Sequence, residues 1–440
     1  MSKKSMLAEP PVPEGDAGLK ALKALVRHRT LLAALETLHQ EMGNIFRVTL
    51  PGFNPVVMVG PEANRYLLIS NRDDVRWRME HDPITKLLHH GLLVVDEDLH
   101  DDLRRLMNPA LHRHMLIDYV ADMVLCTDQI TATWTSGERR DMLDEMRSIA
   151  LLILFQTLFK VDFAPDLERL WSSILRVLKY ISPGPWLFWP GIPRPGYQRA
   201  IRRLDDYLFE IIRARRKVVG EANDLLGRLV TSPSMSDDLI RDQLLTMFVA
   251  GHDTSTALMA WTLYLVGCHP EVMARLQAEV DRVLGCDQPT YNLVSQLKYL
   301  DQVVKEVLRL YPPVHAGMRL AAVDLEFQGY RIPAGTRLMY SVYLSHRQAE
   351  YWPQPGRFDP ERFGPEQSRH RVPNSYVPFG GGPRNCIGAA FGLVETKLVV
   401  ARVLQQFDLT LSQAKVRPQM GATLEPSPGV SMLVQPRSNK

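Results

Sequence analysis

Hydrophobic residues recur at every third or fourth position along most of the chain, and this period predicts α-helices. The segment LKYLDQVVKEVLRLYPP shows it most clearly, with an apolar stripe of Leu300, Val303, Val304, Val307, Leu308 and Tyr311. A second helix is expected after residue 386, with a stripe of Phe391, Val394, Leu398, Ala401 and Leu404. Most of the chain is therefore expected to be helical.

One predicted helix is unusually long. Ser234 or Ser236 can cap its start, Asp237 favours its first turn, and the pair His269-Pro270 ends it. At a rise of about 1.5 Å per residue, the stretch up to residue 268 spans about 50 Å. Such a helix is long enough to cross a whole domain.

Alternating patterns typical of strands are confined to short segments near residues 45 and 55 and over residues 325–343. Strands and helices do not alternate regularly, and no repeat or low-complexity linker divides the chain. The fold class expected is mainly α with small β-sheets (α+β), built as a single domain over residues 19–440.

Residues 1–18 are polar and proline-rich, and we expect them to form a tail of low order. They lack the apolar stretch of a signal peptide or membrane anchor. Only residues 244–268 approach the length of a membrane span, and His252 and Asp253 in their middle make that interpretation unfavourable. We expect a protein of the cytoplasm without a membrane anchor.

Composition narrows the function classes. The 440 residues are 45% hydrophobic and 23% charged, with a net charge of +3 spread along the chain, so no nucleic-acid partner is expected. The loop at 182–196 carries Trp186, Phe188 and Trp189. These aromatic residues belong either to the core or to an apolar flap over a ligand entrance.

The segment FGGGPRNCIG, residues 379–388, places one of only four cysteines at the start of a predicted helix. Unpaired amide groups at a helix N-terminus, together with the charge of Arg384, favour the thiolate of Cys386. A thiolate can act as a nucleophile, a redox switch or a metal ligand.

The other cysteines discriminate among these roles. Cys126, Cys268 and Cys286 are scattered singly, which argues against a redox pair and against a zinc site made of protein ligands alone. A cysteine nucleophile with a distant histidine base stays open. A single axial thiolate to haem iron needs no second protein ligand. An ordinary glycine-rich turn with an incidental cysteine is the simplest alternative.

The segment AGHDTS, residues 250–255, is unusual inside an apolar helix, because Gly251, Asp253 and Thr254 all weaken helices. Gly251 allows close packing against the backbone. Thr254 can divert a carbonyl from its helical partner and open a local distortion where water fits. An acid beside an alcohol is a plausible proton-delivery pair, and a polar seam between packed helices is the alternative.

Two charged segments favour surface roles when judged by pattern alone. Glu306 and Arg309 lie three residues apart and opposite the apolar stripe of their helix, which indicates an exposed ion pair. The segment FDPERF, residues 358–363, has the composition of a charged turn.

Together these segments resemble the cytochrome P-450 superfamily. Residues Phe379, Gly382, Arg384, Cys386 and Gly388 occupy every fixed position of its F-x-x-G-x-R-x-C-x-G haem signature. The order and spacing of the remaining motifs agree, and the resemblance extends from about residue 35 to the end of the chain.

The remaining motifs lie upstream of the haem signature. Residues 250–255 match the oxygen-activating A-G-x-[DE]-T-[ST] motif. Glu306-x-x-Arg309 matches the E-x-x-R motif, and Arg362 is similar to the arginine that joins that pair. The resemblance implies that this triad is internal and supports the fold beneath the haem, which conflicts with the surface interpretation.

The resemblance also implies the cofactor and its ligands. A haem b would lie across the long central helix, with Cys386 as the axial ligand of iron and with Phe379 and Gly251 beside it. Its carboxylates would be bound by His100, Arg104, Arg319 and Arg384. Asp253 and Thr254 would deliver protons during the insertion of one atom of O2 into a lipophilic substrate.

A terpenoid, a fatty acyl chain, a steroid or a polyketide would be hydroxylated or epoxidised, at contacts implied to include Leu88, Phe248, Ala250, Val314 and Ala316. Electrons would come from a separate ferredoxin- or flavodoxin-type donor with its reductase, as in soluble bacterial members. Arg104, Arg105, Arg113 and Arg384 would face that donor. A haem-thiolate peroxygenase or isomerase and a non-catalytic haem protein are the alternatives, and both would be expected to alter Asp253 or Thr254.

Overall fold

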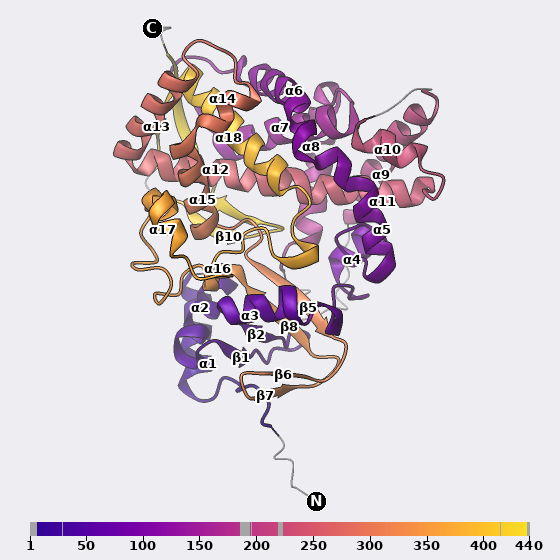
Figure 1. Cartoon of the computed structure of the whole chain (residues 1–440), viewed down its shortest axis with the longest axis vertical. Helices are drawn as coiled ribbons and strands as arrows, with labels where there is room; N and C mark the ends of the chain where they lie inside the picture. The colour runs from indigo at the N-terminus through magenta and orange to yellow at the C-terminus, as the bar shows by residue number, and fades with distance from the viewer. Residues whose placement is uncertain are drawn as a thin grey trace, which may run out of the picture.

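The long helix predicted over residues 237–268 lies across the middle of the helical part of the molecule in a computed structural model (Figure 1). The structure describes the chain except residues 1–6, 29, 185–193, 195, 219–222, 414 and 438–440. The aromatic segment predicted near 186–189 therefore lies outside the described residues. The helical fold class with small sheets is confirmed.

The helices are α1 (Asp16–His28), α2 (Leu31–Met42), α3 (Pro61–Arg65), α4 (Pro83–Leu88), α5 (Glu97–Met107), α6 (Arg113–Thr131), α7 (Met142–Leu154), α8 (Ala164–Ile181), α9 (Tyr197–Arg216), α10 (Leu225–Thr231), α11 (Asp237–Met247), α12 (Asp253–Cys268), α13 (Pro270–Val283), α14 (Tyr291–Gln296), α15 (Lys298–Leu310), α16 (Val342–Ser345), α17 (Pro365–Arg369) and α18 (Ala389–Gln406). A π-helical segment, η6 (Phe248–His252), joins α11 to α12. Ser236 caps α11 by accepting a hydrogen bond from the Leu239 N–H.

The strands are β1 (Ile45–Arg47), β2 (Val56–Met58), β3 (Val75–Arg76), β4 (Glu138–Asp141), β5 (Ala316–Ala321), β6 (Leu325–Phe327), β7 (Tyr330–Ile332), β8 (Arg337–Ser341), β9 (Phe407–Leu411), β10 (Arg417–Met420), β11 (Leu424–Ser427) and β12 (Ser431–Pro436). A five-stranded sheet has the order β1-β2-β8-β5-β3, and β2 pairs with β8 in parallel. β4-β12-β9, β10-β11 and β6-β7 form smaller sheets. The five-stranded sheet and α1–α3 lie at the lower end of the molecule, and most helices gather at the other end (Figure 1).

The expected tail of residues 1–18 is too long. α1 begins at Asp16, and backbone carbonyls of Ala8 and Pro11 accept hydrogen bonds from the N–H groups of Arg331 and Arg47. These bonds give the polar segment a place against later strands, which its composition does not reveal.

Within the described residues, no single helix is both long and apolar enough to span a membrane. The pair Met142–Phe159 and Ala164–Ile181, bent by 116°, meets the criterion of length and composition only.

Candidate functional site

Cys386 lies in a tight loop that connects Phe379 to the first turn of α18. The Cys386 N–H donates to the Phe379 carbonyl over 2.8 Å and closes the loop. Gly382 has a φ of +63°, and a Cβ there would lie 2.2 Å from the Leu68 carbonyl oxygen, so a larger residue would collide with the backbone. This packing leaves the Cys386 side chain exposed at the end of the loop.

The electrostatics of Cys386 differ in part from the prediction. Burial among the surrounding protein atoms raises the pKa of the Cys386 thiol, while a backbone hydrogen bond with Gly388 and the charge of Arg104 act to lower it. The residue nevertheless has an exposed surface, so protein atoms crowd Cys386 without covering it completely. Arg384 was expected to favour the thiolate, but its guanidinium is bound to the Val95 carbonyl and Asp96 instead.

A cavity of about 290 Å³ lies beside this loop and gathers several predicted cofactor residues. His100, Arg319 and Arg384 line it, together with Trp77 and Asp96, which sequence reasoning did not identify. The Asp96 carboxylate accepts hydrogen bonds from Arg384 and from the Trp77 N–H, so it fixes the cavity wall. Asp96 and Trp77 belong to no recognisable motif, and their role depends on tertiary contacts.

Arg319 has the surroundings of a cation that awaits an anionic ligand. Its side chain is 2% exposed, forms no ion pair within the described part of the chain, and stacks 3.5 Å from the centre of the Trp77 ring. Burial lowers the pKa of Arg319. It also lowers the pKa of Arg384 to about 10 and that of His100, whose Nδ1 lies 2.9 Å from Asp101. A buried cation without a carboxylate is costly, so this cavity fits a carboxylate-bearing group such as the haem propionates.

Arg104, the other predicted propionate ligand, is placed differently. It is absent from the residues that line the cavity, and its Nη1 and Nη2 donate to the Asn385 backbone carbonyl and Oδ1 over 2.9 and 2.7 Å. Both ends of the guanidinium therefore hold the residue next to Cys386. In this structure Arg104 therefore contacts the cysteine loop, and its predicted propionate contact stays a prediction.

The Asp253–Thr254 segment follows directly on the π-helical turn. The side chains of His252, Thr254 and Thr256 contact the carbonyls of residues 248, 250 and 252, each four residues back along the chain. Such side-chain bonds compete with the helical ladder and favour a local distortion. Ala250, Gly251 and Thr254 remain half-buried on one face, whereas His252 and Asp253 are buried.

Helix α18 is tied to this segment by a second buried carboxyl. Ser255 Oγ donates to Glu395 Oε2, which links α12 to the helix that follows Cys386. Complete burial raises the pKa of Glu395 to about 8. Gly251 lies closest to Leu154 of α7, where an added Cβ would come within 2.9 Å of Leu154 Cδ1. The predicted close approach to the Gly251 backbone thus involves another helix.

Asp253 itself is part of a buried cluster that the sequence did not reveal. Its Oδ1 lies 3.4 Å from Arg147 Nη2, and its Oδ2 accepts a hydrogen bond from Thr423 Oγ1 over 2.9 Å. The same Arg147 Nη2 also contacts Glu425. Thr423 and Glu425 belong to none of the motifs recognised in the sequence, and only the tertiary fold brings them to Asp253 and Arg147.

Glu306 and Arg309 lie inside the protein, and the surface interpretation is wrong. Both side chains are 0% exposed and form a bidentate ion pair with two distances of 2.7 Å. Arg362 Nε lies 3.4 Å from Glu306 Oε1. The loop before Arg362 covers the polar face of α15, since Asp359 N–H donates to Glu306 and Arg357 carbonyl accepts from Arg309.

The predicted substrate contacts do not share a cavity wall. Leu88 is 0% and Phe248 2% exposed, and both pack in the main hydrophobic core. Val314 is 47% exposed, while Ala250 and Ala316 are half-buried. None of the five lines either of the two cavities described here. Their contact with a substrate stays a prediction.

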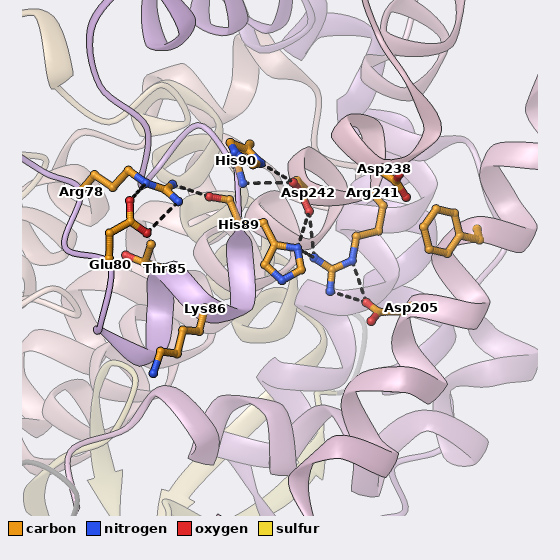
Figure 2. Close-up of a pocket in the computed structure, with 11 residues that line it drawn as sticks. Arg78, Glu80, Thr85, Lys86, His89, His90, Asp205, Asp238, Arg241 and Asp242 are labelled. Carbon is orange, nitrogen blue, oxygen red and sulfur yellow. Dashed lines mark hydrogen bonds and ion pairs between the residues drawn. The ribbon is translucent and has the colours of Figure 1, made fainter. Parts of the chain in front are cut away.

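The larger cavity, about 620 Å³, is lined mostly by charged and polar residues and by none of the predicted haem or proton-delivery residues. In Figure 2 Arg241 of α11 points toward Asp205 and Asp242, and His89 and His90 approach Asp242 from the end of α4. Buried polar side chains of α11 therefore hold the α4 loop. The arrangement is an interhelical clamp outside the cysteine site.

Comparisons with known proteins agree with this geometry. The family model described as Cytochrome P450 matches residues 11–436. The chain is 32% identical over 398 residues to cyclooctat-9-en-7-ol 5-monooxygenase of Streptomyces melanosporofaciens, covering 87% of this chain and 84% of that protein. It is 29% identical to pentalenene oxygenase of Streptomyces avermitilis, covering 87% of this chain and 88% of that protein.

Solved structures give the same result. The retinoic acid-bound cyanobacterial CYP120A1 is similar with a TM-score of 0.85 and 27% identity, covering 98% of this chain and 100% of that chain. The cytochrome P450DA heme domain is similar with a TM-score of 0.86 and 26% identity, covering 99% of this chain and 98% of that chain.

Proposed function

This chain belongs to the cytochrome P450 family of haem monooxygenases, and on that premise we propose that it inserts one oxygen atom of O2 into a lipophilic terpenoid-class molecule. The class is suggested by the relatives' names, which mention cyclooctat-9-en-7-ol and pentalenene, and by the retinoic acid of a structural neighbour. Hydroxylation and epoxidation are both compatible with this proposal. The oxidised carbon is left open.

The observation that supports this proposal most strongly is the exposed Cys386 next to a cavity lined by Arg319, which forms no ion pair among the described residues. We propose that Cys386 ligates the iron of haem b and that Arg319, Arg384 and His100 bind its propionates. Arginine suits this task because its planar fork bonds both oxygens of a carboxylate. When bound through a thiolate, haem iron supplies the oxygen-activating chemistry.

The chain's own residues then position substrate and protons. We assign Asp253 to hold a proton and Thr254 to orient it through its hydroxyl, which now donates to the Ala250 carbonyl over 2.7 Å. The half-buried face of Ala250, Gly251 and Thr254 would face the reacting groups. The apolar core around it limits water, which favours productive oxidation.

Electron supply and localisation complete the proposal. Members of the family depend on a redox partner, and we propose a ferredoxin- or flavodoxin-type donor that approaches the exposed Arg105 and Arg113. The expected cytoplasmic localisation stays a prediction.

The decisive test is the absorption difference spectrum of the reduced protein with carbon monoxide. We expect the long-wavelength Soret band of a thiolate-ligated haem in the wild-type protein and its loss in Cys386→Ser. Cys126→Ser, which changes a buried cysteine outside the loop of residues 379–388, should keep the band. A wild-type band at the position typical of neutral ligands would contradict the proposal. Oxygen consumption with product formation in a surrogate redox chain separates a monooxygenase from a peroxygenase, an isomerase and a silent haem protein.

A further inference from the structure

Asp253 is buried and needs a route by which protons reach it. Its side chain is 1% exposed, so direct exchange with solvent is hindered in this conformation. Of the described residues that contact Asp253, Arg147 and Thr423 are also buried, at 4% and 3% exposure. Any proton supplied from this side must therefore pass through another group.

Glu425 of β11 has the position that such a group requires. Its side chain is 25% exposed, yet it contacts Arg147 Nη2, the same atom that faces Asp253. Asp253 lies near enough for its negative charge to act on Glu425, where it raises the pKa of the Glu425 carboxyl. One carboxyl thus connects the protein surface with the buried acid beside Thr254.

The charges of the cluster do not balance unless a proton is shared. Arg147 contributes one positive charge, and the facing carboxyls of Asp253 and Glu425 contribute two negative charges when both are ionised. An excess charge in such a buried place is costly, so two neighbouring carboxyls tend to retain one proton between them. Asp144, on the other side of Arg147 at 3.6 Å from Nη1, is 58% exposed, so solvent screens its charge, although partial burial and the charge of Asp141 raise its pKa.

The electrostatics of Glu425 agree with this count. Burial is the largest influence, and it raises the pKa of Glu425 to about 7 together with the negative charges of Asp253 and Asp144, against the opposing effect of Arg147. A group with such a pKa is populated in both protonation states near neutral pH, as a proton donor must be.

The two carboxylate oxygens of Asp253 are held with different strength. Its distance of 3.4 Å to Arg147 is long for a charge-assisted hydrogen bond, whereas the Thr423 hydroxyl holds the other carboxylate oxygen at 2.9 Å. Thr423 directly precedes β11 and Glu425 lies within it, so one short stretch of chain both orients Asp253 and brings a second carboxyl to the same cluster.

We propose that Glu425 relays protons from solvent to Asp253, an inference that rests on the proposed function. In the step, the protonated Glu425 carboxyl gives its proton to the Asp253 carboxylate, and the resulting Glu425 carboxylate takes a proton from water at the surface. The net result is one proton moved from solvent to Asp253. Glu425 acts through Asp253 and is thus a positioning residue of the proton path.

The experiment compares Glu425→Gln with Glu425→Asp and Asp144→Asn in the haem-loaded protein. Glutamine keeps the shape but cannot carry the proton, aspartate keeps the acid, and Asp144→Asn removes a carboxyl that contacts Arg147 on its outer side. Infrared spectroscopy on either side of neutral pH detects the C=O band of a protonated carboxyl. Glu395 contributes a second such band, which Glu395→Gln identifies.

We expect a band that titrates near neutral pH in the wild-type protein and in Asp144→Asn but is missing in Glu425→Gln. With a surrogate ferredoxin and its reductase, oxygen consumption should fall about tenfold in Glu425→Gln, less than the hundredfold or more typical of a direct proton donor. Its solvent deuterium isotope effect should rise, its pH profile should flatten, and Glu425→Asp should recover part of the rate.

Several outcomes would overturn the relay. One is an infrared carboxyl band that Glu425→Gln leaves unchanged. Another is oxygen consumption by Glu425→Gln with the pH profile and isotope effect of the wild-type protein. A third is an equal fall in the rate of oxygen consumption in Glu425→Gln and Asp144→Asn, which indicates that Glu425 only holds Arg147 in place. If Glu425→Gln does not fold, the infrared titrations of the wild-type protein and of Glu425→Asp are compared. A band that titrates at the same pH in both proteins then contradicts the assignment to Glu425. A wild-type protein without a thiolate-type carbon monoxide spectrum contradicts the proposed function instead, and the infrared result then still decides whether Glu425 shares the proton.

Discussion

Arg309 and Arg147 are both buried arginines on helices, but their surroundings differ in how fully the guanidinium is bonded. Arg309 uses all five of its N–H groups. Two donate to Glu306, and three donate to backbone carbonyls of His346, Pro355 and Arg357. Such complete bonding favours a single arrangement of the chain.

Arg147 is bonded less completely. Its Nη2 is shared between Asp253 and Glu425, its Nη1 faces Asp144 at 3.6 Å, and its buried Nε has no hydrogen-bond partner in the described structure. An unmade hydrogen bond in the interior is unfavourable, and it commonly marks a place where function rather than stability determines the arrangement. The difference teaches that burial alone does not distinguish a structural arginine from a functional one. These two arginines differ instead in how many of their donors are bonded.

The largest effect is expected at the saturated arginine. Arg309→Lys removes the planar fork and leaves buried acceptors without donors, so the free energy of unfolding should fall by about 3–5 kcal/mol. Urea unfolding followed by circular dichroism measures this change, and haem content should fall with it. The control Arg275→Lys alters an exposed pair with Glu361 and should change stability by less than about 1 kcal/mol. Equal midpoints for the two variants would contradict a structural role of Arg309.

The error made at Arg309 shows what a hydrophobic pattern can and cannot predict. The apolar stripe of α15 was predicted correctly and is buried, as at Val303 and Val307. A stripe identifies the apolar face of a helix, but it does not tell whether a later segment covers the polar face. Here the loop around Arg357 and Asp359 covers it, almost fifty residues further along the chain.

The same reasoning explains the other differences. The periodic helices and the strands near residues 45 and 55 and over 325–343 were predicted from local patterns, although residues 342 and 343 belong to α16. β4, with the sequence ERRD, shows no such pattern. β4 exists because it pairs with β12 almost three hundred residues away. The Arg147–Glu425 contact joins residues 278 positions apart. Spacing motifs locate Asp253, Thr254 and Cys386, but not residues that only the tertiary fold brings beside them.

A smaller effect on the free energy of unfolding is expected at the cluster of Arg147, Asp253 and Glu425, and it should depend on pH. A carboxyl whose pKa is about 7 in the folded protein and near its ordinary value of 4.5 in the unfolded chain binds more protons when folded. The free energy of unfolding therefore falls as pH rises through this window, by roughly 1–3 kcal/mol for Glu425. Thermal unfolding as a function of pH measures the slope.

Glu425→Gln should weaken the dependence of the free energy of unfolding on pH. The quantity to compare is therefore the free energy of unfolding of the wild-type protein minus that of the variant at each pH. Glu395 has a raised pKa of about 8 and contributes a slope of the same sign, so the variant should retain part of the dependence. Arg309→Lys, in contrast, should lower the free energy of unfolding without changing how that free energy depends on pH between about 4.5 and 7. A difference that rises with pH would contradict the raised pKa of Glu425 and weaken the contrast between the two arginines.

The smallest effect is expected at an arginine of a third kind, exposed and bonded to a neutral group. Arg113 Nε donates to Tyr291 Oη over 2.7 Å, and the guanidinium lies 5.9 Å from the centre of that ring. Arg113→Ala should leave folding nearly unchanged but slow reduction by a ferredoxin about two- to threefold at low salt, because long-range attraction to an acidic donor is lost. Stopped-flow reduction at two ionic strengths measures the effect, which salt should abolish. Tyr291→Phe keeps the charge of Arg113 and removes the hydrogen bond, so the ferredoxin should reduce this variant at the wild-type rate. If Tyr291→Phe slows reduction as much as Arg113→Ala, or if salt leaves the effect of Arg113→Ala unchanged, local structure rather than charge is responsible, and the donor docks elsewhere.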